Sequence, residues 1–115
     1  MQIAILSFFH YFTPMFKKRE SIFEVEEGKF LAPKFDKDGL IPVTTTDSNS
    51  GDVLMQGYMN EEALKKTIET KKAHYWSRSR NTLWQKGKTS GFVQKVIDFR
   101  IDDDQDSLWM SVDIA

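Results

Sequence analysis

The sequence of 115 residues contains no cysteine. Disulfide bonds and thiolate metal ligands are therefore excluded, which fits a protein of the reducing cytoplasm. A long apolar run is also missing, because the apolar residues 1–16 are too few to cross a bilayer and are interrupted by His10 and Pro14. This stretch also lacks the basic start and the small-residue cleavage site of a signal peptide. We therefore expect a cytoplasmic protein without membrane contact.

An excess of one charge sign is likewise missing, since the formal net charge is -1, yet the charges are unevenly distributed. From Lys65 to Arg100 there are ten Lys and Arg residues against only Glu69 and Asp98, whereas residues 101–115 carry five Asp and no basic residue. A basic stretch followed by an acidic cluster suits a site that binds an anionic ligand together with a hard cation. Two solvated faces of opposite charge are the alternative interpretation.

The length fits a single domain, and the order of the expected elements indicates a mainly β fold of the α+β class. Residues 41–59 read as a hairpin, because two β-rich runs flank a turn-forming segment. One helix is predicted near 60–72, with Asn60 as its N-cap and with Met59 and Leu64 spaced as a hydrophobic staple. Helical periodicity is found nowhere else in the chain.

The chain after this helix is predicted to be β, which gives a mainly antiparallel domain. The expected strands are residues 73–77, 82–86, 92–101 and 108–114. Within the third of them, Ile97, Phe99 and Ile101 alternate with Asp98 and Arg100. This alternation predicts that the three apolar side chains share the buried face of the sheet.

The sharpest feature is the acidic segment formed by Asp102, Asp103, Asp104, Gln105 and Asp106. Its carboxylates repel one another unless a cation or solvent relieves them. Oxygen-only ligands favour Mg²⁺ or Ca²⁺. An EF-hand is excluded because the required glycine is missing and strands flank the segment. A solvated acidic turn without a metal remains the alternative.

The second feature is a segment, residues 74–91, that combines cations, hydroxyl groups and aromatic rings. Arginine forks, hydroxyl groups and amides next to glycine are suited to binding phosphate, and a tryptophan ring can stack on a base. Each tryptophan could equally be a core residue, and a lone histidine is more often structural than catalytic. The candidate binding residues are Trp76, Ser77, Arg78, Ser79, Arg80, Trp84, Lys86, Thr89 and Ser90.

Taken together, these segments resemble the phosphoribosyl-AMP cyclohydrolase family over residues 35–115. The shared motifs, in their order along the chain, are Phe35-Asp36-x-x-Gly39-Leu40-Ile41-Pro42, Val53-Leu54-Met55-x-x-Tyr58-Met59-Asn60-x-Glu62-Ala63-Leu64, Ala73-His74-Tyr75-Trp76-Ser77-Arg78-Ser79-Arg80, Leu83-Trp84-x-Lys86-Gly87-x-Thr89-Ser90-Gly91-x-x-Gln94 and Asp102-x-Asp104-x-Asp106. Any one motif could occur by chance, but the ordered set identifies the chain as a member of this family. Residues 1–34 are then an N-terminal extension or arm.

The resemblance implies hydrolytic opening of the adenine ring of N1-(5-phosphoribosyl)-AMP between N1 and C6, a step of histidine biosynthesis. It also implies an antiparallel two-sheet pseudobarrel, and a homodimer whose active sites are shared between the subunits. Family members use a zinc-bound water as the nucleophile, with Mg²⁺ assisting. Zinc suits this role because it lowers the pKa of its water towards about 7.

The resemblance also assigns roles to residues. Asp102, Asp104 and Asp106 match the magnesium ligands of the family, and the basic segment matches its substrate motifs. His74 lies in one of these motifs, so general acid/base catalysis by His74 is a hypothesis. The expected partner is therefore a small nucleotide substrate.

The sequence departs from the family at the zinc site. Asp103 stands where the family commonly has a cysteine ligand, although a carboxylate can also bind zinc. The chain stops before the C-terminal Cys-His-x-Gly-x-x-Ser-Cys segment of the family, so we expect a C-terminally incomplete domain. An inactive relic that binds nucleotide and Mg²⁺ is the alternative. A single-stranded nucleic-acid binder is disfavoured because the acidic cluster would repel a polyanion.

Overall fold

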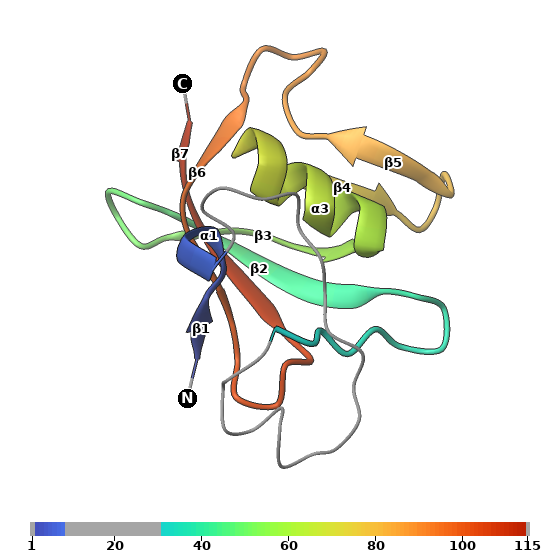
Figure 1. Cartoon of the computed structure of the whole chain (residues 1–115). Helices are drawn as coiled ribbons and strands as arrows, with labels where there is room; N and C mark the ends of the chain where they lie inside the picture. Colours follow the sequence, from blue (N-terminus) through green and yellow to red (C-terminus); the bar gives the residue numbers. More distant parts are fainter. Residues whose placement is uncertain (1, 9–30, 115) are drawn as a thin grey trace.

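A computed structural model describes residues 2–8 and 31–114 of the chain, and these residues form two β-sheets and one helix of more than a single turn (Figure 1). Most of the expected N-terminal arm, residues 9–30, lies outside the described residues. None of the helices within the described part is long and apolar enough to cross a membrane. The elements in chain order are β1 (Ile3–Ala4), α1 (Ile5–Phe8), β2 (Ile41–Asp47), β3 (Val53–Met59), α3 (Glu61–Thr70), β4 (His74–Ser77), β5 (Thr82–Gln85), β6 (Gln94–Ile101) and β7 (Leu108–Ile114).

The larger sheet has the strand order β1-β6-β7-β2-β3, and the smaller one is the β4–β5 hairpin. The predicted hairpin of residues 41–59 is confirmed as the antiparallel pair of β2 and β3. The expectation of an antiparallel architecture is wrong for one pair, because β7 runs parallel to β2. The long connection between these two strands includes α3, and such a connection permits parallel pairing. Among the described strands neither sheet closes on itself, so the mainly β class is confirmed whereas a barrel is not seen.

The helix α3 is the element that the sequence predicted most fully. The Asn60 side chain accepts a hydrogen bond from the backbone N–H of Ala63 at 2.8 Å, as an N-cap does. Met59 and Leu64 are both fully buried, as the staple requires. The helix ends at Lys71, which adopts the left-handed conformation that is common after a helix C-terminus.

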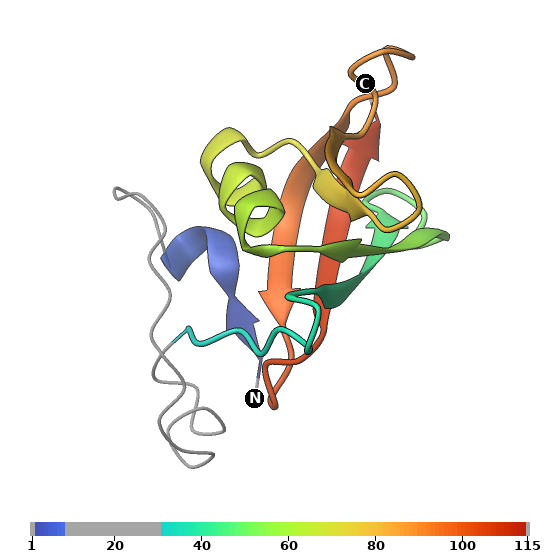
Figure 2. The ribbon, with the colours of Figure 1, turned by 90° about the vertical axis from the view of Figure 1, so that its right-hand side faces the viewer.

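The core lies between α3 and the inner face of the larger sheet, with the β4–β5 hairpin beside the helix (Figures 1 and 2). Phe99 and Ile101 are buried there as predicted. Ile97 is 52% exposed, so its predicted burial is wrong. A β-bulge between Val96 and Asp98 shifts the pleat by one residue, which places Val96 inside and Ile97 outside.

Residues near the N-terminus also belong to this core. Ile3 and Ala4 pair with Ile101 and Arg100 of β6, and Ile5 is fully buried. Farther along the chain, residues 31–33 are buried as well. The folded unit therefore begins earlier than residue 35 and includes the strand β1 at one edge of the larger sheet.

Candidate functional site

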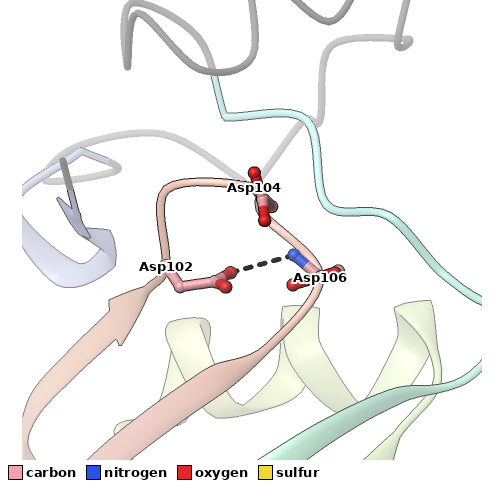
Figure 3. Close-up of side chains that lie close together, drawn as sticks. All are labelled: Asp102, Asp104 and Asp106. Atoms are coloured by element: carbon pink, nitrogen blue, oxygen red, sulfur yellow. Dashed lines mark hydrogen bonds between the residues drawn. The ribbon is translucent and has the colours of Figure 1, made fainter.

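The segment between β6 and β7 forms an exposed loop of residues 102–107, called the aspartate loop below (Figure 3). One oxygen from each of Asp102, Asp104 and Asp106 can be chosen so that all three lie within 4.8 Å of one another. The loop is closed by Asp102, whose Oδ1 accepts hydrogen bonds from the backbone N–H groups of Asp106 at 3.0 Å and Ser107 at 3.1 Å. The fold therefore gathers the three predicted magnesium ligands, two of them exposed and Asp102 half-buried.

Electrostatics in the aspartate loop favour a cation. The pKa of Asp106 is raised, chiefly by hydrogen bonding with the Asp102 side chain and further by burial and by the negative charges of Asp102 and Asp104. A bound cation would remove this repulsion. The donor set consists of carboxylate oxygens alone, which fits Mg²⁺ by its ligand chemistry.

Zinc does not fit the residues that the structure describes. Asp103 is exposed in the same loop, but the group of possible metal ligands there contains carboxylates only. His74 lies on β4, away from this loop. Zinc sites are built mainly on histidine nitrogen and cysteine sulfur, and neither belongs to the ligand group that the described residues form.

A cavity of about 490 Å³ opens between the β3 edge of the larger sheet and the β4–β5 hairpin. We call it the hairpin cavity. Five of the candidate substrate residues line it, namely Trp76, Ser77, Arg78, Ser79 and Trp84. The other lining residues are Met55, Gln56, Gly57, Tyr58 and Tyr75. Aromatic rings, hydroxyl groups and a guanidinium thus converge on one space, which suits a nucleotide.

The wall of the hairpin cavity is fixed by a buried polar network around Tyr75. The Tyr75 hydroxyl donates to Gln94 Oε1 at 2.7 Å, so the Thr45 hydroxyl, also at 2.7 Å, donates to the Tyr75 oxygen. Burial raises the pKa of Tyr75 to about 12, and the phenol therefore stays protonated. A side chain at Gly57 would approach the Tyr75 ring to 2.9 Å, so glycine lets this ring pack against β3.

Three cations of the basic segment lie over aromatic rings near this cavity. The Arg78 guanidinium is 3.9 Å from the centre of the Tyr58 ring. Arg80 and Lys86 lie 5.7 Å and 5.3 Å from the Trp84 ring. Cation–π contacts of this kind orient a charge while leaving it available to an anion.

His74 lines a second cavity of about 470 Å³, which it shares with Thr89, Lys66, Lys88 and other residues. Its Nδ1 lies 2.7 Å from the carbonyl oxygen of Lys72, and because a carbonyl only accepts, Nδ1 carries the proton. Burial lowers the pKa of His74, and the nearby Lys66, Lys72 and Lys88 lower it further, although the bond to Lys72 opposes them. The imidazole is therefore neutral at pH 7, with Nε2 as a potential base.

The loop of residues 86–91 carries the remaining candidates. Thr89 and Ser90 are exposed, and Lys86 is half-buried beside Trp84. The loop turns at Gly87, where φ is 86° and a side chain would come within 2.3 Å of the Phe92 backbone. Only glycine satisfies both conditions, and the Gly87 carbonyl accepts from the N–H of Gly91 at 2.8 Å.

The structure therefore brings the candidates together as two groups rather than one. The basic and aromatic residues surround the β4–β5 hairpin, whereas the aspartate loop lies at the opposite end of β6 from the loop of residues 86–91 (Figures 1 and 2). Trp84 lines both cavities of the first group. Within one copy of the described chain the aspartates do not face the hairpin cavity.

Several lining residues were not predicted from the sequence. Tyr58 lies within one of the motifs that the chain shares with the family, so that motif could have pointed to it. Lys66 lies on the exposed side of α3. It lines the second cavity because the β4–β5 hairpin packs next to this helix, and the sequence does not indicate that packing. Arg100 and Trp109 are paired across β6 and β7 and line a third cavity of about 500 Å³ beside the aspartate loop. No sequence motif marks this pair.

Comparison with known proteins gives one consistent result. The sequence model of the family "Phosphoribosyl-AMP cyclohydrolase" matches residues 55–115. A phosphoribosyl-AMP cyclohydrolase of Rhodopseudomonas palustris strain TIE-1 is 56% identical over 90 residues, which are 78% of this chain and 60% of the relative. The enzyme of the same name from Brucella canis is 56% identical over 91 residues, 79% of this chain and 66% of the relative. The chain thus spans 60% to 66% of the length of these relatives.

Proposed function

The chain belongs to the phosphoribosyl-AMP cyclohydrolase family, and we propose that it takes part in the hydrolytic opening of the adenine ring of N1-(5-phosphoribosyl)-AMP. The bond opened lies between N1 and C6, and the product continues into histidine biosynthesis. One observation carries the proposal. The residues matched by the family, 55–115, include both the hairpin cavity and the aspartate loop, and each has the chemistry that this substrate requires.

The substrate carries two phosphates and a purine ring, and we assign its anionic groups to the basic segment. Arg78 and Arg80 present guanidinium forks, and Ser77 and Ser79 add hydroxyl groups at the same turn. Lys86, Thr89 and Ser90 contribute from the adjoining loop. Trp76 and Trp84 offer ring faces on which the base can stack.

We assign Mg²⁺ to Asp102, Asp104 and Asp106, whose oxygens are close enough to share one cation. When bound, Mg²⁺ would supply positive charge to an anionic or polarised oxygen of the reacting group. We assign His74 Nε2 to proton transfer, because a neutral imidazole near pH 7 can both accept and return a proton. The zinc-activated water of the family enters no step here, since the described residues do not gather its ligands.

A second copy of the chain is part of the proposal. The two groups of candidate residues are separated within one copy, so a dimer in which the hairpin cavity of one subunit faces the aspartate loop of the other would unite them. We also propose that the two sheets close into a pseudobarrel. A test mixes two impaired variants, Arg78→Ala with reduced turnover and Asp104→Asn with none. Recovery of turnover on mixing supports shared sites. Absence of turnover in the mixture, when the wild-type chain measured separately is active, contradicts them.

The activity is tested by following the ultraviolet absorbance of phosphoribosyl-AMP in the presence of Mg²⁺ and Zn²⁺. Turnover that disappears in Asp104→Asn and falls in Arg78→Ala supports the proposal. Asp52→Asn, which alters an exposed carboxylate in the β2–β3 turn, is the matched control and should retain full activity. Absence of turnover by the wild-type chain under all metal conditions would contradict it.

A second function is favoured by the ligands that the described residues offer. They provide an oxygen donor set that fits Mg²⁺ and a cavity that suits a nucleotide, and binding of these two ligands without catalysis is the second proposal. Calorimetric titration with phosphoribosyl-AMP distinguishes the two functions. Binding that depends on Mg²⁺ but is not followed by an absorbance change indicates the binding protein.

A further inference from the structure

Gln105 is the one fully buried residue of the aspartate loop. Its exposed fraction is 0%, although Asp103, Asp104 and Asp106 around it are exposed. A buried amide in an acidic, solvent-facing loop needs a physical reason, because burial of a polar side chain is costly unless its hydrogen bonds are made.

The reason lies in the segment of residues 31–34, which is hydrogen-bonded to the loop at Gln105. The Gln105 side-chain oxygen Oε1 accepts a hydrogen bond from the backbone N–H of Ala32 at 2.7 Å. Its backbone carbonyl accepts another from the N–H of Lys34, also at 2.7 Å. Leu31 and Ala32 are themselves buried, so the loop is tied to a fixed part of the core.

The backbone at Gln105 is also unusual. Its φ is 57°, in the left-handed region that glycine adopts freely and that a residue with a side chain enters at a cost. The N–H of Gln105 donates to the carbonyl of Asp102 at 3.0 Å, which closes the turn of the loop. Gln105 therefore occupies a position where glycine would suit the backbone better, and its side-chain hydrogen bond to Ala32 helps to compensate for this cost.

The side chains of residues 104 to 106 alternate between outward and inward positions, and this alternation gives the Gln105 contact a function. Residues 104 and 106 flank Gln105, and holding its side chain inward leaves the two neighbouring carboxylates outward, near Asp102. We propose that Gln105 is a positioning residue for the metal site. It sets the aspartate loop in a metal-binding geometry before the cation arrives, by its bond to the backbone of Ala32. The inference rests on the proposed function, because it assumes that the loop binds Mg²⁺.

The experiment measures the affinity of the whole chain for Mn²⁺, used as a paramagnetic probe of the magnesium site, by electron paramagnetic resonance. Gln105→Gly removes the contact but suits the left-handed backbone, so the turn itself is retained. Gln105→Glu keeps an acceptor oxygen at the same reach. We expect Gln105→Gly to weaken Mn²⁺ binding about tenfold, the lower end of what loss of a supporting hydrogen bond costs. Gln105→Glu should lose less Mn²⁺ affinity than Gln105→Gly, because it keeps the oxygen that accepts from Ala32.

Asn81→Gly is the matched control, because Asn81 has a φ of 52° in the β4–β5 turn, far from the aspartate loop. It should leave Mn²⁺ affinity unchanged. Thermal unfolding of each variant is measured without metal, as a check that the variant is folded. Wild-type affinity in Gln105→Gly would overturn the inference while leaving the metal site intact. A wild-type chain that binds no Mn²⁺, or whose binding survives in Asp104→Asn, would overturn the metal site and the inference with it.

Discussion

The aspartate loop and the turn of the β4–β5 hairpin differ in how their charged side chains are held. In the loop the hydrogen bonds accepted by the Asp102 and Gln105 side chains are 2.7 to 3.1 Å long, and the bond from Ala32 to Gln105 is buried. At the hairpin turn the side-chain contacts between Ser77, Ser79 and Arg80 are 3.3 to 3.4 Å and exposed.

This difference follows from the charges. Clustered carboxylates repel one another, so their geometry must be imposed by the backbone before a cation is bound. Exposed arginines next to aromatic rings need no such restraint, because an incoming phosphate can complete their geometry. The comparison teaches that the proposed metal end is organised by folding, whereas the geometry of the proposed anion end is left for a ligand to complete.

The largest effect is expected from Asp102→Ala. The substitution removes a proposed metal ligand and leaves the N–H groups of Asp106 and Ser107 without the acceptor Oδ1. We expect Mn²⁺ affinity to fall by about 100-fold and the free energy of unfolding to fall by about 1 to 3 kcal/mol. Titration with Mn²⁺ and urea unfolding measure the two losses.

Asp104→Asn is the control for this prediction, because the Asp104 side chain is exposed and the amide keeps its size and shape. It should lose metal affinity with little loss of stability. Equal destabilisation by both variants would show that the loop is not organised by Asp102, and the contrast between the two ends would then fail.

Gly57→Ala tests the rigid wall of the hairpin cavity, which contrasts with its exposed turn. The new methyl group would lie 2.9 Å from the Tyr75 ring, and that ring is held by hydrogen bonds through Thr45 and Gln94. We expect the free energy of unfolding to fall by about 1 to 3 kcal/mol because the cavity wall is overpacked. Gln56→Ala on the exposed side of the same strand should change it by less than about 0.5 kcal/mol. Equal urea midpoints for the two variants would show that Tyr75 can move aside.

The elements near α3 could be predicted because their signals are local. The cap at Asn60 and the turn between β2 and β3 depend on residues close together in the chain. The burial of Ile97 could not be judged in this way, since a bulge of one residue reverses the pattern of alternation. The parallel pairing of β7 with β2 depends on contacts between distant segments and has no local signal.

The candidate site shows the same limit. The resemblance to the family, rather than the residue types alone, pointed to Asp102, Asp104 and Asp106 as one set, and the structure places their carboxylates close together. The role of Gln105 could not be predicted, since its partner Ala32 is distant in sequence. The separation of the two ends is likewise set by the length of β6 rather than by any motif.

Arg78→Ala tests the anion end directly. The side chain is exposed and stacks on Tyr58, so its removal should change the free energy of unfolding by less than about 0.5 kcal/mol. The affinity for AMP, measured by calorimetry, should fall by about tenfold because a charge-assisted contact to phosphate is worth about 1.5 kcal/mol. Arg78→Lys should recover only part of this loss, since it keeps the charge without the fork. Unchanged AMP affinity in Arg78→Ala would remove this residue from the anion site.

The smallest expected effect separates the two ends by their response to acid. Burial, with Lys66, Lys72 and Lys88 nearby, lowers the pKa of His74 in the folded chain below its unfolded value. The unfolded chain therefore binds more protons, and stability is lost as the pH falls through the ordinary histidine range.

At the aspartate loop the pKa of Asp106 is raised instead, so protonation relieves repulsion there and acid does not destabilise this end through Asp106. Thermal unfolding between about pH 7 and about pH 5 should show a smaller fall in Tm for His74→Gln than for the wild type. Asp106→Asn should not reduce the fall in Tm, because the raised pKa of Asp106 means that its protonation does not destabilise the folded chain. A fall that is reduced in Asp106→Asn but not in His74→Gln would reverse the assignment, since the acid-sensitive group would then lie in the aspartate loop rather than beside α3.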